Sequence, residues 1–416
     1  MKFIHTADWH LGATLREESR SAEHCAFLRW LLETLKSEEA DALIVAGDIF
    51  DSANPSAESL KILCEFLRSA ANQMPILQTF LMGGNHDSAN RIEAPRELFS
   101  LANTKVVGAW PWTEQGKWRE KDLILPIKDK NGSICAWLGA VPFLRPGDLF
   151  LENPKDNAEN WLVESIRERY SQVAREIKKL RTPDQAMILT GHLYAAGTTL
   201  SPDSERYVQR GNIEAVSTEV FPKEAAYVAL GHLHLAQEVG KLQHIRYCGS
   251  PIPMSVNERN YPCQVVAVEI EKDHFTNIKP IRVPIIREIL LLPGNEPADK
   301  SIVINKLREF PDKKNCNSPR DSWPLVEIRV LLDSPDPFLK NEIENVAKNK
   351  ALVIIRIESS YRNAVNEKQL PLDLDKISPM EMFTMKWKKD FQADPDEALL
   401  KAFREVLQEV QHKGEA

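Results

Sequence analysis

The sequence lacks the long apolar runs that membrane-spanning proteins need. Its longest uninterrupted apolar stretches, such as residues 42–46 and 352–355, are only a few residues long, whereas a helix that spans a bilayer takes about 20. The opening MKFIHTADWH also contains no apolar signal-peptide region before Asp8. We therefore expect a cytoplasmic protein with no membrane segment.

Paired cysteines are absent as well. The six cysteines, at positions 25, 64, 135, 248, 263 and 316, form no C-x-x-C pair, which argues against a disulfide framework and against a thiolate zinc site. With 43% hydrophobic and 27% charged residues, the composition is that of an ordinary globular protein. The length of 416 residues predicts two or three domains.

An excess of positive charge is also lacking. Lys and Arg number 53 against 60 Asp and Glu, which gives a formal net charge of −7, so no overall attraction to nucleic acid is expected. Any DNA binding has to come from a local surface. The chain has no G-x-x-x-x-G-K-[ST] phosphate loop, so an ATP-driven activity would need a separate ATPase subunit.

The first half of the chain alternates short apolar runs with helical patterns, which is typical of a layered α/β domain. Five of these runs are predicted strands that end directly before polar motifs. The runs cover residues 3–6, 42–46, 76–81, 186–189 and 225–230, and the motifs that follow are D-W-H, G-D, G-G-N-H-D, G-H and G-H-L-H. Because α/β sheets place their ligand sites at strand ends, these motifs predict one shared site.

Seven side chains in these motifs are candidate metal ligands: Asp8, His10, Asp48, Asn85, His192, His232 and His234. In an extended chain, residues two apart face the same side, so Asp8 with His10, and His232 with His234, can each present two donors to one point. Seven ligands are too many for one ion, so two ions are expected; if Asp48 bridges them, each ion receives four protein ligands. Two such ions about 3.5 to 4 Å apart activate water and clamp the oxygens of a phosphate ester. Ligation by carboxylate, amide and imidazole without thiolate favours manganese, iron or zinc.

The motif series resembles that of the calcineurin-like metallophosphoesterases and, more narrowly, that of the SbcD family, the nuclease subunits of bacterial SbcCD complexes. The narrower resemblance rests on HTADWHLG at 5–12, VAGDIFD at 45–51, GGNHDS at 83–88, PFLRP at 142–146, LGHLH at 230–234 and YCGSPIPMS at 247–255. The implied fold class is α/β, a layered β-sandwich flanked by helices, with a small α+β capping domain and a C-terminal helical segment.

The resemblance also implies roles for the residues of the site. The two sets of metal ligands are Asp8, His10, Asp48 and His234 for one ion, and Asp48, Asn85, His192 and His232 for the other. His86 is implied to stay off the metals and to protonate the leaving oxygen or steady the transition state, with Asp87 orienting its imidazole. Alternatively, His86 only satisfies a neighbouring backbone carbonyl. The histidines at 5, 24, 244, 274 and 412 are expected to be structural or surface residues.

The implied activity is that of a nuclease with two divalent ions, most readily Mn²⁺, in an ATP-dependent complex for DNA repair, replication and recombination. Double-strand 3′–5′ exonuclease and single-strand or hairpin endonuclease activities are implied. The implied partners are DNA, an SbcC-type SMC-like ATPase and a second copy of the chain in a homodimer. One alternative is a phosphomonoesterase or cyclic-nucleotide phosphodiesterase with the same dinuclear site. Another is a non-catalytic partner of an ATPase, against which the intact ligand set argues.

The pattern changes near residue 275, where prolines at 280, 284, 293 and 297 begin. We place a domain boundary there. The family resemblance implies that residues 1–275 form the metallophosphoesterase domain, that 276–365 form a DNA-capping domain and that 366–416 form a helical segment that docks on SbcC. An alternating strand at 326–330, a helix at 338–347 and an apolar run at 352–357 predict a β-α-β module. Two capped helices are predicted to start at 378–381 and 394–397. The apolar stripe of the second helix either packs on the preceding domain or docks on another protein.

Two positions depart from the family pattern. Asp51 stands where eukaryotic and archaeal relatives carry a histidine after G-D-x-F, so a mechanism that needs that histidine cannot be assumed here. Val256 stands where an aromatic residue is common. Separately, Trp110, Trp112 and Trp118 cluster in one segment, where packing is favoured over base stacking.

Overall fold

The computed structural model describes residues 1–113, 116–149, 161–196, 198 and 216–362, together with isolated positions between 380 and 403. Residues 1–361 form one compact unit and residues 362–416 a second one. None of the helices that the structure describes is both long enough and apolar enough to cross a membrane.

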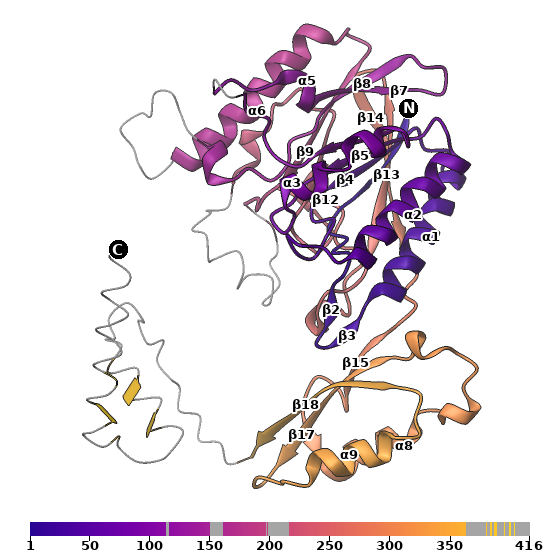
Figure 1. Cartoon of the computed structure of the whole chain (residues 1–416), viewed down its shortest axis with the longest axis vertical. Helices are drawn as coiled ribbons and strands as arrows, with labels where there is room; N and C mark the ends of the chain where they lie inside the picture. Colours follow the sequence, from indigo (N-terminus) through magenta and orange to yellow (C-terminus); the bar gives the residue numbers. More distant parts are fainter. Residues whose placement is uncertain are drawn as a thin grey trace. The chain divides into compact units, whose positions relative to one another are not determined.

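Two six-stranded sheets form the core of the first 282 residues (Figure 1). The first sheet has the order β14-β13-β1-β4-β5-β6, and the second has the order β11-β12-β10-β9-β8-β7. The strands of the first sheet are β1 Lys2–Thr6, β4 Ala42–Ala46, β5 Gln78–Met82, β6 Thr104–Val107, β13 Gln264–Glu271 and β14 His274–Arg282. Those of the second sheet are β7 Ile124–Lys128, β8 Ile134–Gly139, β9 Ala186–His192, β10 Tyr227–Gly231, β11 Gln237–Val239 and β12 Leu242–Tyr247. The predicted layered β-sandwich and its five motif-bearing strands are confirmed.

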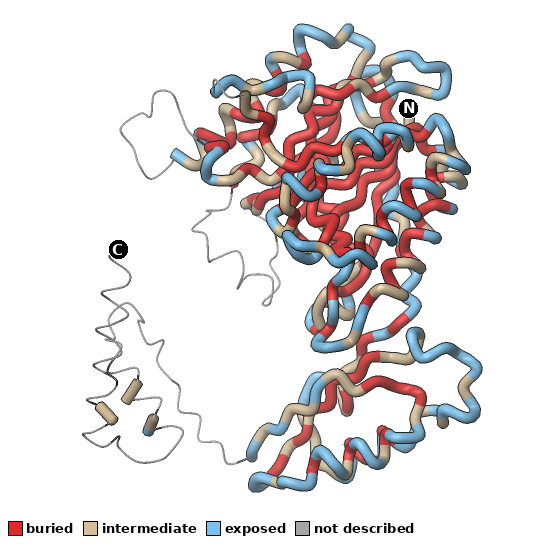
Figure 2. Tube along the Cα trace, in the orientation of Figure 1, coloured by how far each residue is buried: buried red, intermediate tan, exposed pale blue. Residues whose placement is uncertain are grey.

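Alternation along the strands explains the layers. In β4, Ile44 packs with the second sheet, whereas its neighbours Leu43 and Val45 pack with helices α1 Ser21–Ser37 and α2 Ala57–Gln73. Both faces of the sheet are therefore covered, as its uninterrupted apolar strands require. Helix α6 Trp161–Leu180 packs against the second sheet. Figure 2 shows the buried residues concentrated in the strands.

Several short elements connect these layers. They are the hairpin of β2 Thr14–Leu15 and β3 Glu18–Ser19, and the helices α3 Ala89–Glu93, α4 Arg96–Ser100 and α5 Glu120–Leu123. The three tryptophans lie near α5: Trp110 is buried, and the Arg169 guanidinium lies 5.3 Å from the ring centroid of Trp110 and 4.9 Å from that of Trp112. The tryptophans thus pack within the protein, as predicted in preference to base stacking.

The expected domain boundary at residue 275 falls inside a strand and is wrong in position. β14 pairs with β13 in antiparallel register from His274 to Arg282, so the first sheet extends to Arg282. The prolines misled the prediction because β14 is an edge strand, where Pro280 costs no inner ladder hydrogen bond.

Residues 289–361 form an α+β module with its own sheet. Its elements are β15 Ile289–Leu292, β16 Ala298–Asp299, α8 Lys300–Glu309, β17 Leu325–Leu332, α9 Leu339–Ala347 and β18 Val353–Tyr361. β17 and β18 are parallel, which confirms the predicted β-α-β unit. Glu327 of β17 is 2% exposed and paired with Arg329 at 2.8 Å.

Described positions in the second unit are helical around 380–388 and 399–403. The rings of Phe383 and Phe403 stack with centroids 4.2 Å apart, so these two segments pack against each other. The predicted helix starts at 378–381 and 394–397 lie almost entirely outside the described residues.

Candidate metal centre

All the predicted site residues lie at one edge of the two sheets. The parallel strands β1, β4 and β5 of the first sheet end there beside β9 and β10 of the second. Backbone hydrogen bonds join the loops after β1 and β4, from Asp8 N to Gly47 O and from His10 N to Asp48 O, both at 3.0 Å. Five strand ends that are far apart in the sequence therefore converge, as predicted.

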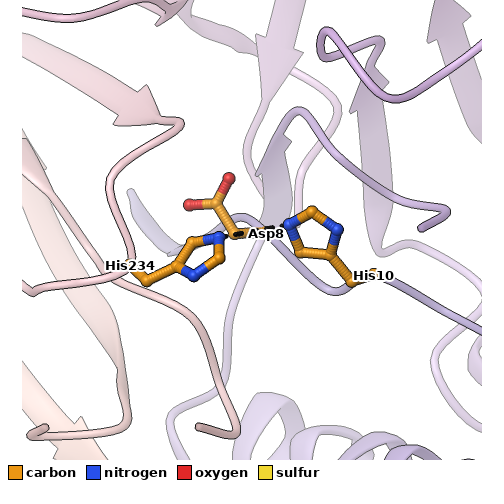
Figure 3. A group of neighbouring side chains, drawn as sticks. All are labelled: Asp8, His10 and His234. Atoms are coloured by element: carbon orange, nitrogen blue, oxygen red, sulfur yellow. Dashed lines mark hydrogen bonds between the residues drawn. The ribbon is translucent and has the colours of Figure 1, made fainter. Parts of the chain in front are cut away.

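A first group consists of Asp8, His10 and His234, whose potential ligand atoms lie within 4.8 Å of one another. Figure 3 shows the Asp8 carboxylate beside the two rings, whose Nε2 atoms are 3.2 Å apart. Asp8 Oδ2 is buried and has no hydrogen-bond partner among the described residues. A buried carboxylate oxygen without a partner costs free energy that a bound cation would offset, so this group fits a metal ion.

A second group consists of Asp48, His192 and His232, and Asn85 joins it. Asn85 Oδ1 lies 2.9 Å from His192 Nε2 and 3.0 Å from His232 Nδ1. Carboxylate, amide and imidazole donors that converge in this way fit a divalent ion.

Asp48 faces both groups. Its Oδ2 atom lies 3.2 Å from His192 Nε2 and 3.7 Å from His10 Nε2, while its Oδ1 atom accepts a hydrogen bond from His86 N. This is the position that a ligand shared between two ions would occupy. The two groups contain the residues that the family resemblance assigned to each ion.

The expectation that each two-apart pair chelates one point is wrong for His232 and His234, because they lie in different groups. The backbone is also not extended. Asp8, His10, Asp48 and His232 have φ angles of 53°, 48°, 47° and 100°. Left-handed backbone turns successive side chains away from the alternation of a strand, and such strain concentrates at functional sites.

The glycines of the motifs provide room for the ligands. A Cβ atom at Gly47 would lie 2.2 Å from His192 Nδ1, and one at Gly84 would lie 2.1 Å from Asp48 Oδ1. Any side chain at these two positions would displace a residue of the second group. These two glycines contribute no ligand atom to the site, but they leave the room that its ligands occupy.

The prediction that Asp87 orients His86 is wrong. The buried Asp87 carboxylate accepts hydrogen bonds from the backbone N–H groups of Ile49, Phe50 and Gly84, and no described side chain donates to it. His86 Nδ1 instead lies 2.8 Å from the backbone carbonyl oxygen of Asp51. Asp87 therefore holds the loops that carry Asp48 and Asn85, and the Asp51 carbonyl orients the His86 ring.

The other ring nitrogen of His192 and of His234 has a hydrogen-bonding partner. His192 Nδ1 donates to the carbonyl of Ala46 at 2.9 Å, and His234 Nδ1 lies 3.2 Å from both oxygens of Glu258. Metal-binding histidines commonly have such partners. His10 Nδ1 lies 3.3 Å from Asp51 Oδ1 but forms no hydrogen bond with a described residue. Sequence reasoning missed Glu258, which lies three residues beyond the matched stretch 247–255 and shows no periodicity.

Charges within the centre shift the pKa values of its histidines. Burial alone would lower the pKa of His192, but Asp48 and Asp8 outweigh it and raise the pKa to about 9. Glu258 and Asp8 likewise outweigh burial at His234 and raise its pKa to about 9. Burial and the charge of His192 lower the pKa of His232 to about 3. Without a cation, protons on His192 and His234 thus balance the carboxylates, and metal binding has to displace them.

The histidines expected outside the centre stay outside it. His5 is buried with Nδ1 3.0 Å from the hydroxyl of Tyr227, His24 is buried in α1, and His274 is exposed. His244 stacks on Phe275, and His412 lies outside the described residues.

Comparison with known proteins identifies related families. Residues 1–236 match the family described as calcineurin-like phosphoesterase, and residues 296–391 match one described as type 5 capsule protein repressor C-terminal domain. The chain is 31% identical over 390 residues to the D subunit of nuclease SbcCD from Escherichia coli K12, with 92% of each chain covered. It is 33% identical over 392 residues to the same protein of Rhodobacter capsulatus, with 92% of this chain and 93% of the relative covered. It is 30% identical over 424 residues to that of Bacillus subtilis 168, with 99% of each covered.

Proposed function

Since the chain belongs to the calcineurin-like phosphoesterases and, within them, to the SbcD nuclease subunits, we propose that its strand-end residues hold two divalent ions for cleavage of DNA phosphodiester bonds. The observation that carries the proposal is the position of Asp48 between two groups of ligands. The phosphomonoesterase alternative is not favoured, because the relatives named as nucleases match the chain almost from end to end.

The proposed ligands follow the two groups. Asp8, His10, Asp48 and His234 would hold one ion, and Asp48, Asn85, His192 and His232 the other. We propose manganese for both, as the family resemblance implies; a donor set without thiolate suits manganese, iron or zinc. Two such ions supply an activated water and stabilise the charge that develops on the phosphoryl oxygens.

His86 has a separate role in this proposal. With Nδ1 on the Asp51 carbonyl, Nε2 is the nitrogen left to face a phosphodiester. From there it would protonate the leaving sugar oxygen or donate a hydrogen bond to the phosphate. Because Asp87 fixes the surrounding loops through three backbone amides, the ring is held at the edge of the ligand groups.

We further propose an assembly in the cytoplasm with DNA and an SbcC-type ATPase; the relatives' names indicate the SbcC partner, and the family resemblance implies the rest. The α+β module at 289–361 would cap the site and guide DNA, and residues 366–416 would dock on the ATPase. All six cysteines are free, which agrees with a reducing compartment. We also propose the homodimer that the family resemblance implies; the exposed Leu98 and Leu101, which are 69% and 84% exposed, are candidate contacts for it.

The test is cleavage of end-labelled linear double-stranded DNA by the purified protein, with and without Mn²⁺, beside a small phosphomonoester. We expect DNA cleavage that depends on Mn²⁺ and starts from the 3′ ends. Cleavage of the monoester with DNA left intact, even after addition of an SbcC-type ATPase, would contradict the nuclease function and support the phosphatase.

A further inference from the structure

Glu258 is the buried carboxylate that contacts a proposed ligand from outside the two groups. Its side chain is 3% exposed, and both of its oxygens lie 3.2 Å from His234 Nδ1. Its own segment holds it in place, since Oε2 accepts from Met254 N at 2.9 Å and Oε1 accepts from Ser255 Oγ at 3.2 Å. The carboxylate therefore fixes the His234 ring with Nε2 directed toward His10.

The groups next to Nδ1 of His192 and His10 are not buried carboxylates like Glu258. His192 donates to the carbonyl of Ala46, which is a residue of β4 and part of the sheet core. His10 lies near the carboxylate of Asp51, which is 46% exposed and so is screened by water. Of these three contacts, the one with Glu258 joins a proposed ligand to a buried charge outside both sheets, in the short 3-10 helix Val256–Glu258.

The segment that carries Glu258 is also anchored on the α+β module. Two residues earlier, the buried Val256 packs in an apolar cluster with Ile289, Leu325 and Val353 of the module. One residue later, Arg259 Nη2 donates to Asn295 Oδ1 of the module at 2.6 Å, and Arg259 Nη1 donates back to the Val256 carbonyl at 3.0 Å. One short stretch of chain thus contacts the module and the metal centre at once.

We propose that residues 254–259 couple the α+β module to the metal centre: the module fixes this segment through Val256 and Arg259, and Glu258 positions His234. The inference rests on the proposed function, in which His234 is a metal ligand. Glu258 is a positioning residue, because it acts through His234. A movement of the module, for example on contact with DNA, would then change how firmly the first ion is held.

The test of Glu258 is Mn²⁺ binding to the full-length protein, measured by titration calorimetry after removal of bound metal. Glu258→Gln keeps the size of the side chain and an acceptor oxygen but removes the charge. We expect one of the two ions to bind about 10- to 100-fold more weakly, as is usual when an outer partner of a ligand is lost, and the other ion to bind within about twofold of the wild type. Glu258→Asp, which keeps the charge on a shorter side chain, should bind that ion with intermediate affinity.

Glu327→Gln is the matched control. Glu327 is as buried as Glu258, at 2% exposed, but its ion pairs are with Arg329 and Arg356 of the module rather than with a residue of the metal centre. Both ions should bind to this variant as they do to the wild type. Thermal unfolding of all variants without metal shows whether any loss of affinity comes from loss of fold.

The anchor is tested with a second pair of variants. Arg259→Ala removes the contact between the segment and Asn295, whereas Arg320→Ala removes a contact of the module with Glu18 in the β2–β3 hairpin, at 2.7 and 3.1 Å. We expect Arg259→Ala to weaken the same ion by about two- to tenfold and Arg320→Ala to leave it unchanged. Equal effects of the two substitutions would contradict coupling through the segment.

The outcomes separate this inference from the proposed function. If the wild type binds fewer than two Mn²⁺ ions, the proposed two-ion function fails. If the wild type binds two ions and Glu258→Gln binds both as tightly, the positioning role is overturned. An equal weakening of both ions together with a lower unfolding temperature would also overturn it, since Glu258 would then act on the fold alone.

Discussion

The two ligand groups are supported in different ways, although they share Asp48. His192 of the second group is the last residue of β9, has a fully buried side chain and donates to the carbonyl of Ala46 in β4. His10 and His234 of the first group lie on loops and are backed by Asp51, on a loop, and by Glu258, at the end of the short 3-10 helix Val256–Glu258. His192 therefore ties the second group to the core of the sheets, while Asp48, Asn85 and His232 of that group lie on loops. The first group depends on loops and on the segment of Glu258, which contacts the α+β module, so the first group is where the rest of the molecule can act on the centre.

The largest effect is expected from a substitution that weakens metal binding in both groups. Because Asp48 Oδ2 faces His10 and His192, Asp48→Ala should weaken both ions. The loss should exceed the roughly 100-fold that removal of an outer partner costs. Mn²⁺ titration and DNA cleavage measure it. An Asp48→Ala variant that binds one ion normally would show that the groups do not share this residue.

The ring of His86 lies close to His10 and Asp48, and its substitution tests whether catalysis needs more than the ions. We expect His86→Gln to reduce Mn²⁺-dependent DNA cleavage by about 10²- to 10⁴-fold while both ions stay bound. The comparison of cleavage rate with metal content separates the two effects. Unchanged cleavage would support the alternative that the ring only satisfies the Asp51 carbonyl.

Proton release compares the groups directly, because each contains one histidine with a pKa near 9. At about pH 7.5 both His192 and His234 carry a proton before metal binds, and both must lose it to act as ligands. Two Mn²⁺ ions should therefore displace about two protons, and the affinity should rise as the pH rises toward about 9. Calorimetry in two buffers of different ionisation enthalpy counts these protons. An affinity independent of pH between about 7 and 9 would contradict the charge balance described here.

The smallest effect lies outside both groups. Trp112→Phe removes the hydrogen bond from Trp112 Nε1 to Asp148 Oδ1, which is 3.0 Å long. The free energy of unfolding, measured by urea denaturation, should fall by about 0.5 to 1.5 kcal/mol, with Mn²⁺ binding unchanged. A loss of Mn²⁺ binding would mean that the tryptophan cluster supports the centre as well as the fold.

The sequence was sufficient for the parts of the fold that follow from periodicity. Buried parallel strands such as β4 read as continuous apolar runs, and their ends carry the site residues for a topological reason. Features that depend on contacts between distant parts of the chain have no periodic pattern in the sequence. The position of His234 in a different group from His232 depends on left-handed backbone, and the extent of β14 depends on its pairing with β13.

The outer contacts of the site were the hardest to predict. Asp87 looked like a partner of His86 because the two are adjacent, but its oxygens are occupied by backbone amides. Glu258 lies 24 residues from His234 in the sequence, and only the packing of the second sheet against its neighbouring loops brings them together. The contacts of Asp87 and Glu258 are not made within strands, so no alternation of apolar and polar residues predicts them.

The central claim is that Asp48 joins two ions in one centre, and anomalous X-ray diffraction at the manganese edge from crystals grown with Mn²⁺ tests it most directly. Two peaks are predicted. One should lie within bonding distance of Asp8, His10 and His234, the other within bonding distance of Asn85, His192 and His232, and Asp48 should contact both. A single peak, or two peaks of which only one contacts Asp48, would contradict the claim.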